Sequence, residues 1–201
     1  MRGGARFWFG LELRGVENIP VDGPLIITPN HQTYADPPLV TIPVRRPVYY
    51  MAWDKLFSIP LFGRLIRLLR AFPVDIYSSD PGAVREARRL VQDGAAVMIF
   101  PEGGRSFDGT LGHFKLGAFR LAVTLGASVL PVTISGGFEA WPPQRVLPRR
   151  GHMTITYHPP LRAQAGAEPR AAARDLAQRA RAAIASALPD GHAQAPRSST
   201  R

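Results

Sequence analysis

The sequence predicts a single α/β domain in which a largely parallel or mixed sheet is flanked by helices. Six short apolar segments have the composition of buried strands, and helical patterns separate most of them along the chain. Such alternation of strands and helices is typical of sheets whose strands run parallel. With 201 residues and a hydrophobic content of 45%, the chain can bury one substantial core.

Two of the six predicted strands end where polar segments begin. They cover residues 25–29, 48–52, 71–74, 95–100, 128–134 and 153–157. Two polar segments, residues 30–36 and 100–106, stand at the ends of the first and the fourth strand. Because parallel sheets bind ligands at the carboxyl ends of their strands, we expect both segments to serve the same chemistry.

The clearest helix signal spans residues 81–92. Ser79 or Asp80 can cap its start, Pro81 suits its first position, and Gly94 stands just after its end. Similar signals predict three more helices: a short one opened by Pro37, one at 116–125, and a surface helix within 162–188. Residues 189–201 are polar and contain proline, which predicts a flexible C-terminal tail.

Composition and charge exclude several function classes. The chain has no cysteine, which excludes disulfides, thiolate metal sites and cysteine nucleophiles. Its formal net charge of +10 favours an anionic partner. Residues 1–15 have no signal-peptide pattern, and the longest uncharged stretch, 121–138, is interrupted by Gly126 and Pro131. We therefore expect any contact with a membrane to be peripheral.

The first polar segment places His31 five residues before Asp36. On one regular helix these side chains would point about 140° apart, so their pairing requires His31 in the loop and Asp36 in the first helical turn. Pro37 favours that arrangement, because proline suits a helix start. With no serine or cysteine paired nearby, the simplest role for His31 is a general base oriented by Asp36. The alternative is that Asp36 only caps the helix.

The second polar segment combines glycines with a cation. Glycines let backbone N–H groups approach an anion closely, and arginine can clamp a phosphate through two parallel hydrogen bonds. The glutamate could position an acceptor or shape the loop, and an ordinary glycine-rich turn is the alternative for the whole segment. The candidate substrate-binding residues are Glu102, Gly103, Gly104, Arg105 and Ser106.

These motifs resemble those of the PlsC-like glycerolipid acyltransferases, which include the 1-acyl-sn-glycerol-3-phosphate (lysophosphatidic acid) acyltransferases. The family pattern Asn-His-x-x-x-x-Asp is matched by Asn30, His31 and Asp36. The later pattern Phe-Pro-Glu-Gly-x-Arg-Ser is matched by residues 100–106, and Val-x-Pro-Val is matched by residues 129–132. The likeness covers residues 11 to 160.

The resemblance implies an enzyme that moves a fatty acyl group from acyl-CoA or acyl carrier protein to the free hydroxyl of lysophosphatidate, giving phosphatidate. His31 and Asp36 would be catalytic, residues 102–106 would bind the acceptor, and no cofactor or metal would be needed. The acyltransferase domain would be residues 1–188. The family usually has threonine at Gly104, and many relatives have arginine at Ile76. The second departure keeps another lysolipid, such as lyso-ornithine lipid, as an alternative acceptor.

Residues 55–72 offer a candidate membrane contact. On a helix, Arg64, Arg67 and Arg70 would lie on one side, and basic amphipathic helices bind anionic membrane surfaces. A cytoplasmic chain held peripherally at the inner face of the cell membrane follows, with acidic acyl carrier protein as a further candidate partner. The alternative is a helix that packs its apolar face on the core.

A basic nucleic-acid-binding module is the hypothesis from another class. The net charge alone would give non-specific attraction to phosphates. However, no recognised nucleic-acid motif is present, and the arginines are scattered rather than gathered into a stripe with aromatic residues. We therefore expect no nucleic-acid partner.

Overall fold

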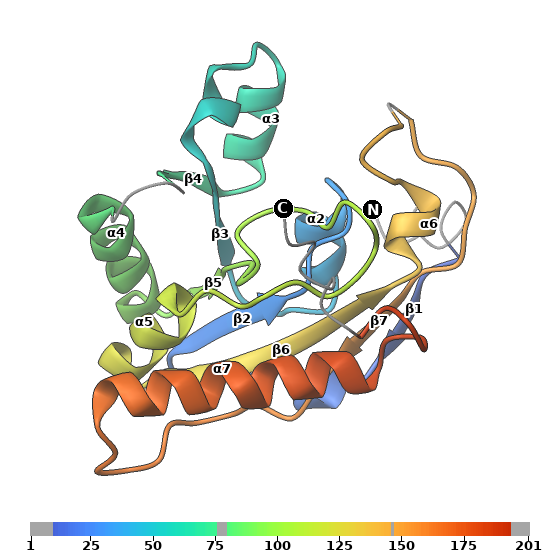
Figure 1. Ribbon diagram of the computed structural model, residues 1–201. Coiled ribbons are helices and arrows are strands. Elements are labelled where there is room, and N and C mark those ends of the chain that lie inside the picture. The colour runs from blue at the N-terminus through green and yellow to red at the C-terminus, as the bar shows by residue number, and fades with distance from the viewer. Residues whose placement is uncertain (1–9, 76–79, 146, 194–201) are drawn as a thin grey trace, which may run out of the picture.

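The computed structural model describes residues 10–75, 80–145 and 147–193, which form a layered α/β structure (Figure 1). Within these residues, seven strands make one sheet in the order β1-β7-β6-β2-β5-β3-β4. Neighbouring strands are parallel except β6 and β7, which are antiparallel. The strands are β1 (Glu12–Arg14), β2 (Leu25–Pro29), β3 (Val48–Trp53), β4 (Ala71–Val74), β5 (Ala96–Met98), β6 (Ser128–Ser135) and β7 (Thr154–Tyr157).

The predicted α/β class with a largely parallel, mixed sheet is confirmed, and each of the six predicted strands is present. The fourth is shorter than predicted, because β5 ends at Met98 and residues 99–100 already lead into the second polar segment. Strand β1 was not predicted from the sequence. This edge strand has three residues, Glu-Leu-Arg, and lacks the apolar run by which the others were found.

The helices follow local signals closely. Helix α4 has the predicted bounds, and its N-cap is Asp80, whose carboxylate accepts a hydrogen bond from Ala83 N at 2.9 Å. Ser79, the other candidate cap, lies outside the described residues. The helices are α2 (Asp36–Val40), α3 (Phe62–Leu68), α4 (Pro81–Gln92), α5 (Gly117–Leu125), α6 (Gly137–Ala140) and α7 (Pro169–Ser186), with 3-10 helices η1 (Val16–Asn18) and η2 (Asp54–Ser58).

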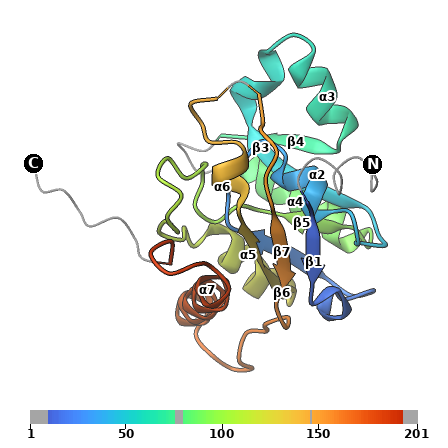
Figure 2. The ribbon, with the colours of Figure 1, turned by 90° about the vertical axis from the view of Figure 1, so that its right-hand side faces the viewer.

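Helices cover both faces of the sheet. Successive residues of a strand point to opposite faces, so β2 sends Ile26 to one side and Leu25 and Ile27 to the other. On the Ile26 side the core is closed by α4, α5 and α7, of which α5 and α7 lie to the left of the strands in Figure 2. On the other side it is closed by α2 and the chain that follows it. The central strand β2 is therefore buried along its whole length.

Residues 55–72, the candidate membrane contact, do not form one continuous helix. The chain forms η2, turns at residues 59–61, forms the short helix α3 and enters β4 at Ala71. Pro60 has no N–H to continue a helix, and Leu61 adopts a φ of 63°. Arg70, expected on the same helical face as Arg64 and Arg67, lies after the end of α3. Both η2 and α3 project beyond the rest of the structure at the top of Figure 1 and Figure 2.

Helix α7 and the residues after it contact the loop that contains Leu111, which is distant in the sequence. Residues 189–193 continue from α7, and His192 O accepts a hydrogen bond from Leu111 N at 2.8 Å. Within the part of the chain that the structure describes, no helix is both long enough and apolar enough to cross a bilayer.

Candidate active site

The first polar segment begins where β2 leaves the sheet. Asn30 Nδ2 donates to Ile134 O at 3.0 Å, and Ile134 N donates to Asn30 Oδ1 at 2.7 Å. The buried Asn30 side chain thus pairs with β6 in the way that a backbone amide of the strand would. It fixes the point at which the loop that carries His31 starts.

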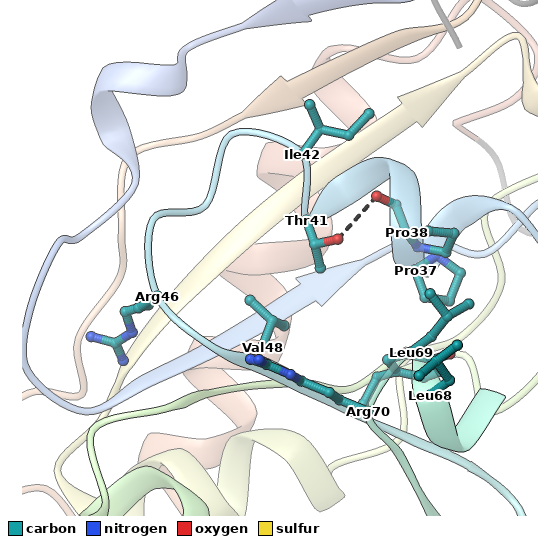
Figure 3. A pocket seen from close by; sticks show the side chains of 10 residues that line it. Pro37, Pro38, Thr41, Ile42, Arg46, Val48, Leu68, Leu69 and Arg70 are labelled. Carbon is teal, nitrogen blue, oxygen red and sulfur yellow. Dashed lines mark hydrogen bonds between the residues drawn. The ribbon is translucent and has the colours of Figure 1, made fainter. Parts of the chain in front are cut away.

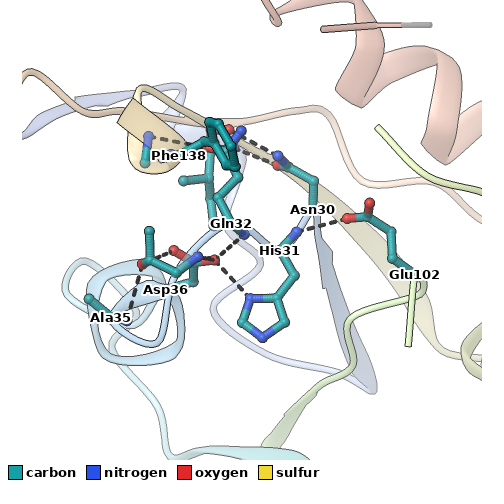
Figure 4. A network of polar contacts seen from close by, with 10 residues as sticks. Asn30, His31, Gln32, Ala35, Asp36, Glu102 and Phe138 are labelled. Atoms are coloured by element: carbon teal, nitrogen blue, oxygen red, sulfur yellow. Dashed lines mark hydrogen bonds and ion pairs between the residues drawn. The ribbon is translucent and has the colours of Figure 1, made fainter. Parts of the chain in front are cut away.

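His31 and Asp36 are paired as the sequence analysis expected (Figure 4). His31 Nδ1 lies 2.8 Å from Asp36 Oδ2, with His31 in the loop and Asp36 as the first residue of α2. The fully buried Asp36 carboxylate also accepts hydrogen bonds from Gln32 N, Thr33 N and the Thr33 hydroxyl. Because a carboxylate accepts from Nδ1, that nitrogen carries the proton, and Nε2 is the nitrogen that can take one up.

Packing restricts the imidazole further. The rings of His31 and Phe100 are stacked, with centroids 3.9 Å apart and planes inclined by 23°. Phe100 is the first residue of the second polar segment, which follows β5, so the two predicted polar segments meet at this ring pair. Asp36 holds one edge of the imidazole and Phe100 covers one face, which leaves the Nε2 edge directed away from Asp36 (Figure 4).

Glu102 contacts the backbone on both sides of the site. Its Oε1 accepts from His31 N and its Oε2 accepts from Gly112 N, each at 2.8 Å. Burial raises the pKa of the Glu102 carboxyl, and these two N–H groups oppose that shift. Of the two roles that the sequence left open for Glu102, the contacts favour shaping the loop.

The other residues of the second polar segment divide into two groups. Gly103, Gly104 and Arg105 line a cavity together with His31. Gly103 has a φ of 75°, and a Cβ there would lie 2.7 Å from Lys115 Nζ, so this position requires glycine. The Arg105 guanidinium lies 3.7 Å from the centre of the Tyr34 ring.

Ser106 stabilises the backbone of the loops that carry His31 and Thr110. Its N–H donates to His31 O at 2.8 Å, and its hydroxyl donates to Thr110 O at 2.9 Å. The backbone of His31 is therefore held from both sides, by Glu102 at the N–H and by Ser106 at the carbonyl.

The cavity has a volume of ≈ 520 Å³ and is lined by two chemically different groups of residues. The charged and polar lining residues include the cations Arg105 and Lys115, together with His31 and the carboxylate of Asp75. The apolar lining residues come mostly from β3, η2 and α3 and include Tyr50, Met51, Ala52, Trp53, Leu56, Phe62 and Ile66. Such a cavity suits an amphiphile that carries an anionic group at one end and a hydrocarbon chain at the other.

A second cavity has a volume of ≈ 430 Å³, and Pro37 and Arg70 are among the residues that line it (Figure 3). Pro37 and Tyr50 line both cavities, so the two adjoin. Arg70 lines this second cavity and is placed outside the first. Ile76, where many relatives carry an arginine, lies outside the described residues. Of Arg70 and Arg105, either of which could take the place of that arginine, Arg105 lines the cavity that contains His31.

The acyltransferase family model matches residues 10–135, more than half of the chain, and this span includes both polar segments. The chain belongs to this family. The 1-acyl-sn-glycerol-3-phosphate acyltransferase of Pseudomonas aeruginosa is 32% identical over 182 residues, covering 88% of this chain and 68% of that protein. This places the chain with the PlsC-like acyltransferases, as the motifs indicated.

The structural comparison agrees with this family assignment. The crystal structure of the 1-acyl-sn-glycerophosphate (LPA) acyltransferase PlsC from Thermotoga maritima aligns with a TM-score of 0.70 and 31% identity, covering 88% of this chain and 73% of that chain. The chloroplastic acyltransferase LPAT1 of Arabidopsis thaliana is 28% identical over 158 residues, 77% of this chain and 44% of its own length. This acyltransferase chain spans about half the length of the chloroplastic relatives it matches.

Some residues that build the acyltransferase site were not singled out from the sequence. Gln32 Oε1 accepts from Gly137 N at 2.9 Å and Phe138 N at 3.1 Å, which ties the His31 loop to α6 (Figure 4). Gly112 holds Glu102, and Tyr34 supports Arg105. Gln32 and Tyr34 lie within the first polar segment, and Gly112 lies outside both segments. The sequence carries no signal that would predict the contacts these residues make.

Proposed function

We propose that this chain is a lysophosphatidate acyltransferase that uses an acyl thioester, acyl-CoA or acyl carrier protein, to form phosphatidate. The observation that carries the proposal is the pairing of His31 with Asp36, with His31 and Arg105 lining the same cavity. A base that shares a cavity with two cations fits a hydroxyl-bearing phosphate ester, and the apolar lining residues fit acyl chains. The names of the relatives in Pseudomonas aeruginosa and Thermotoga maritima support the same reaction.

The proposed reaction is direct transfer between the two substrates. His31 Nε2 takes the proton of the acceptor hydroxyl as the oxygen attacks the thioester carbonyl. The tetrahedral intermediate collapses, the C–S bond breaks, and the thiolate leaving group takes the proton from the imidazolium. Asp36 stabilises that imidazolium, and because a thioester is already activated, a base and correct positioning are sufficient.

Thiol release from acyl-CoA by the purified protein, measured with and without lysophosphatidate, tests the proposal. The expected result is release that depends on the acceptor, with phosphatidate as the lipid product. The same assay is run with acyl carrier protein as donor and with lyso-ornithine lipid as acceptor. Turnover with lyso-ornithine lipid but not with lysophosphatidate would overturn the proposed acceptor and keep the reaction type.

Arg105→Ala should raise the KM for lysophosphatidate about tenfold or more and change kcat little, because a charge-assisted hydrogen bond to phosphate contributes about 1.5–3 kcal/mol. Arg88→Ala is the matched control, since Arg88 is exposed on α4 and its loss changes the net charge equally. Initial rates over a range of acceptor concentrations give both constants. An unchanged acceptor KM in Arg105→Ala would contradict the phosphate role.

We propose further that an anionic membrane surface binds the projecting η2–α3 segment, at the cytoplasmic face of the cell membrane. Leu61 and Leu68 are 78% and 80% exposed, and Leu65 and Ile59 are about half exposed. Arg64 is exposed on α3, and the Arg67 guanidinium lies 5.0 Å from the Phe57 ring centre. Exposed leucines beside cations are the composition of a peripheral membrane contact.

Replacing Leu61 and Leu68 with serine should reduce binding to vesicles that contain phosphatidylglycerol by about tenfold or more, because the inserted apolar area is lost. Vesicle sedimentation measures the bound fraction. Val84→Ser is the control, since Val84 is 50% exposed but lies on α4. Equal binding of the double variant and the wild type would remove η2–α3 as the contact.

A further inference from the structure

Arg181, on the last turns of α7, donates hydrogen bonds to the loop that faces Glu102. Its Nη2 donates to Leu111 O at 3.1 Å, and its Nε donates to Gly112 O at 3.3 Å. The same Nη2 lies 3.4 Å from Ala193 O, so the guanidinium also holds the chain after α7. Arg181 is partly buried, and Leu111 is almost completely buried.

The Glu102 carboxylate connects the loop that Arg181 contacts to the backbone of His31. Gly112 O accepts from Arg181, and Gly112 N donates to Glu102 Oε2. Glu102 Oε1 then accepts from His31 N. The fit at Gly112 is close, because a Cβ there would lie 3.0 Å from Glu102 Oε2. A shift of the loop therefore moves the carboxylate that holds the backbone of His31.

We propose that Arg181 is a positioning residue for acyl transfer, acting on His31 through Gly112 and Glu102. The proposal rests on the proposed function, in which His31 is the base. Helix α7 follows the span that the family model matches, residues 10–135, so this support comes from the C-terminal part of the chain.

The physical reason is that proton transfer depends steeply on geometry. Without Arg181, two loop carbonyls lose a charged donor, and the loop no longer presents Gly112 N to Glu102 at a fixed place. The partly buried Glu102 carboxylate then needs another donor, and binding one would move it away from His31 N. Displacements of about 1 Å can change a rate by about 10²-fold even when they start away from the reacting atoms.

The kinetic test compares Arg181→Ala with Arg174→Ala. Both remove one positive charge from α7, but the exposed Arg174 side chain donates within its own helix, to Arg170 O. Arg181→Ala should lower kcat about tenfold with each KM within about twofold of wild type, and Arg181→Lys should recover most of the loss. A kcat in Arg181→Ala equal to that in Arg174→Ala, at equal Tm, would overturn the proposal.

A double-mutant cycle tests the route. In a Glu102→Gln background, Arg181→Ala should lower kcat by no more than about twofold, because the contact through which it acts is already disturbed. An undiminished tenfold effect in that background would show that Arg181 acts by another route and would overturn the proposal.

Hydrogen exchange gives a readout that needs no substrate. The amides of residues 102–115 should exchange faster in Arg181→Ala than in wild type or Arg174→Ala, whereas those of α4 should not change. Unchanged exchange of residues 102–115 would overturn the proposal even if the wild type proved inactive on every lysolipid. Faster exchange together with an inactive wild type would keep the contact between Arg181 and the loop but refute the proposed function, and with it the role of Arg181 in acyl transfer.

Discussion

His31→Ala should lower kcat for acyl transfer about 10³-fold and leave the protein folded, since a positioned general base contributes about 10²–10⁴-fold. Nδ1 is engaged by Asp36, so the ring offers Nε2 to the acceptor hydroxyl. The fold should tolerate the change because Asp36 keeps its hydrogen bonds from Gln32, Thr33 N and the Thr33 hydroxyl. Single-turnover rates and a thermal unfolding curve measure the two effects.

His113→Ala is the control for this variant. His113 is exposed on the loop between Gly112 and α5, so its removal deletes an imidazole close in sequence to the site without touching the Asp36 network. It should keep wild-type kcat. A His31→Ala protein that is folded and retains a tenth of wild-type kcat would refute the base assignment.

Asp36→Asn should lower kcat about 10²-fold or more while preserving the local geometry. The asparagine oxygen can accept from His31 Nδ1, Gln32 N and Thr33 N in place of Oδ2, and its amide can donate to the Thr33 hydroxyl oxygen. The variant therefore removes the negative charge and little else. Its loss of rate measures how strongly the carboxylate stabilises the imidazolium that forms during proton transfer.

Asp36→Ala should behave differently. It leaves the buried N–H groups of Gln32 and Thr33 without their acceptor, and each such group costs about 1–3 kcal/mol. The free energy of unfolding should fall as well as kcat, and a denaturant titration separates the two effects. Wild-type kcat in a folded Asp36→Asn protein would contradict a role for the charge.

The parts of the structure that could be predicted are those determined by near neighbours in the sequence. The bounds of α4 follow from Pro81 and its cap, and the pairing of His31 with Asp36 is settled by the helix start that Pro37 provides. Alternation of apolar runs with helices was sufficient for the class of the fold. The resemblance to the acyltransferase motifs added the reaction type.

The parts that could not be predicted depend on residues that are far apart in the chain. Glu102 reaches His31 N across 71 positions, Asn30 reaches Ile134 across 104, and Arg181 reaches Gly112 across 69. No spacing or periodicity encodes such pairs. The expected alignment of Arg70 with Arg64 and Arg67 on one helix was wrong for a local reason, because the helix begins only after Pro60 and ends before Arg70.

The central place of β2 has a consequence for the biosynthesis of the protein. Its neighbours in the sheet are β5 and β6, which emerge from the ribosome long after it. Until residue 98 has been made, this buried strand has neither edge paired; until β6 has been made, its second edge stays open and Asn30 lacks its partner Ile134. Nascent chains of this kind expose aggregation-prone surface until both edges of β2 are paired.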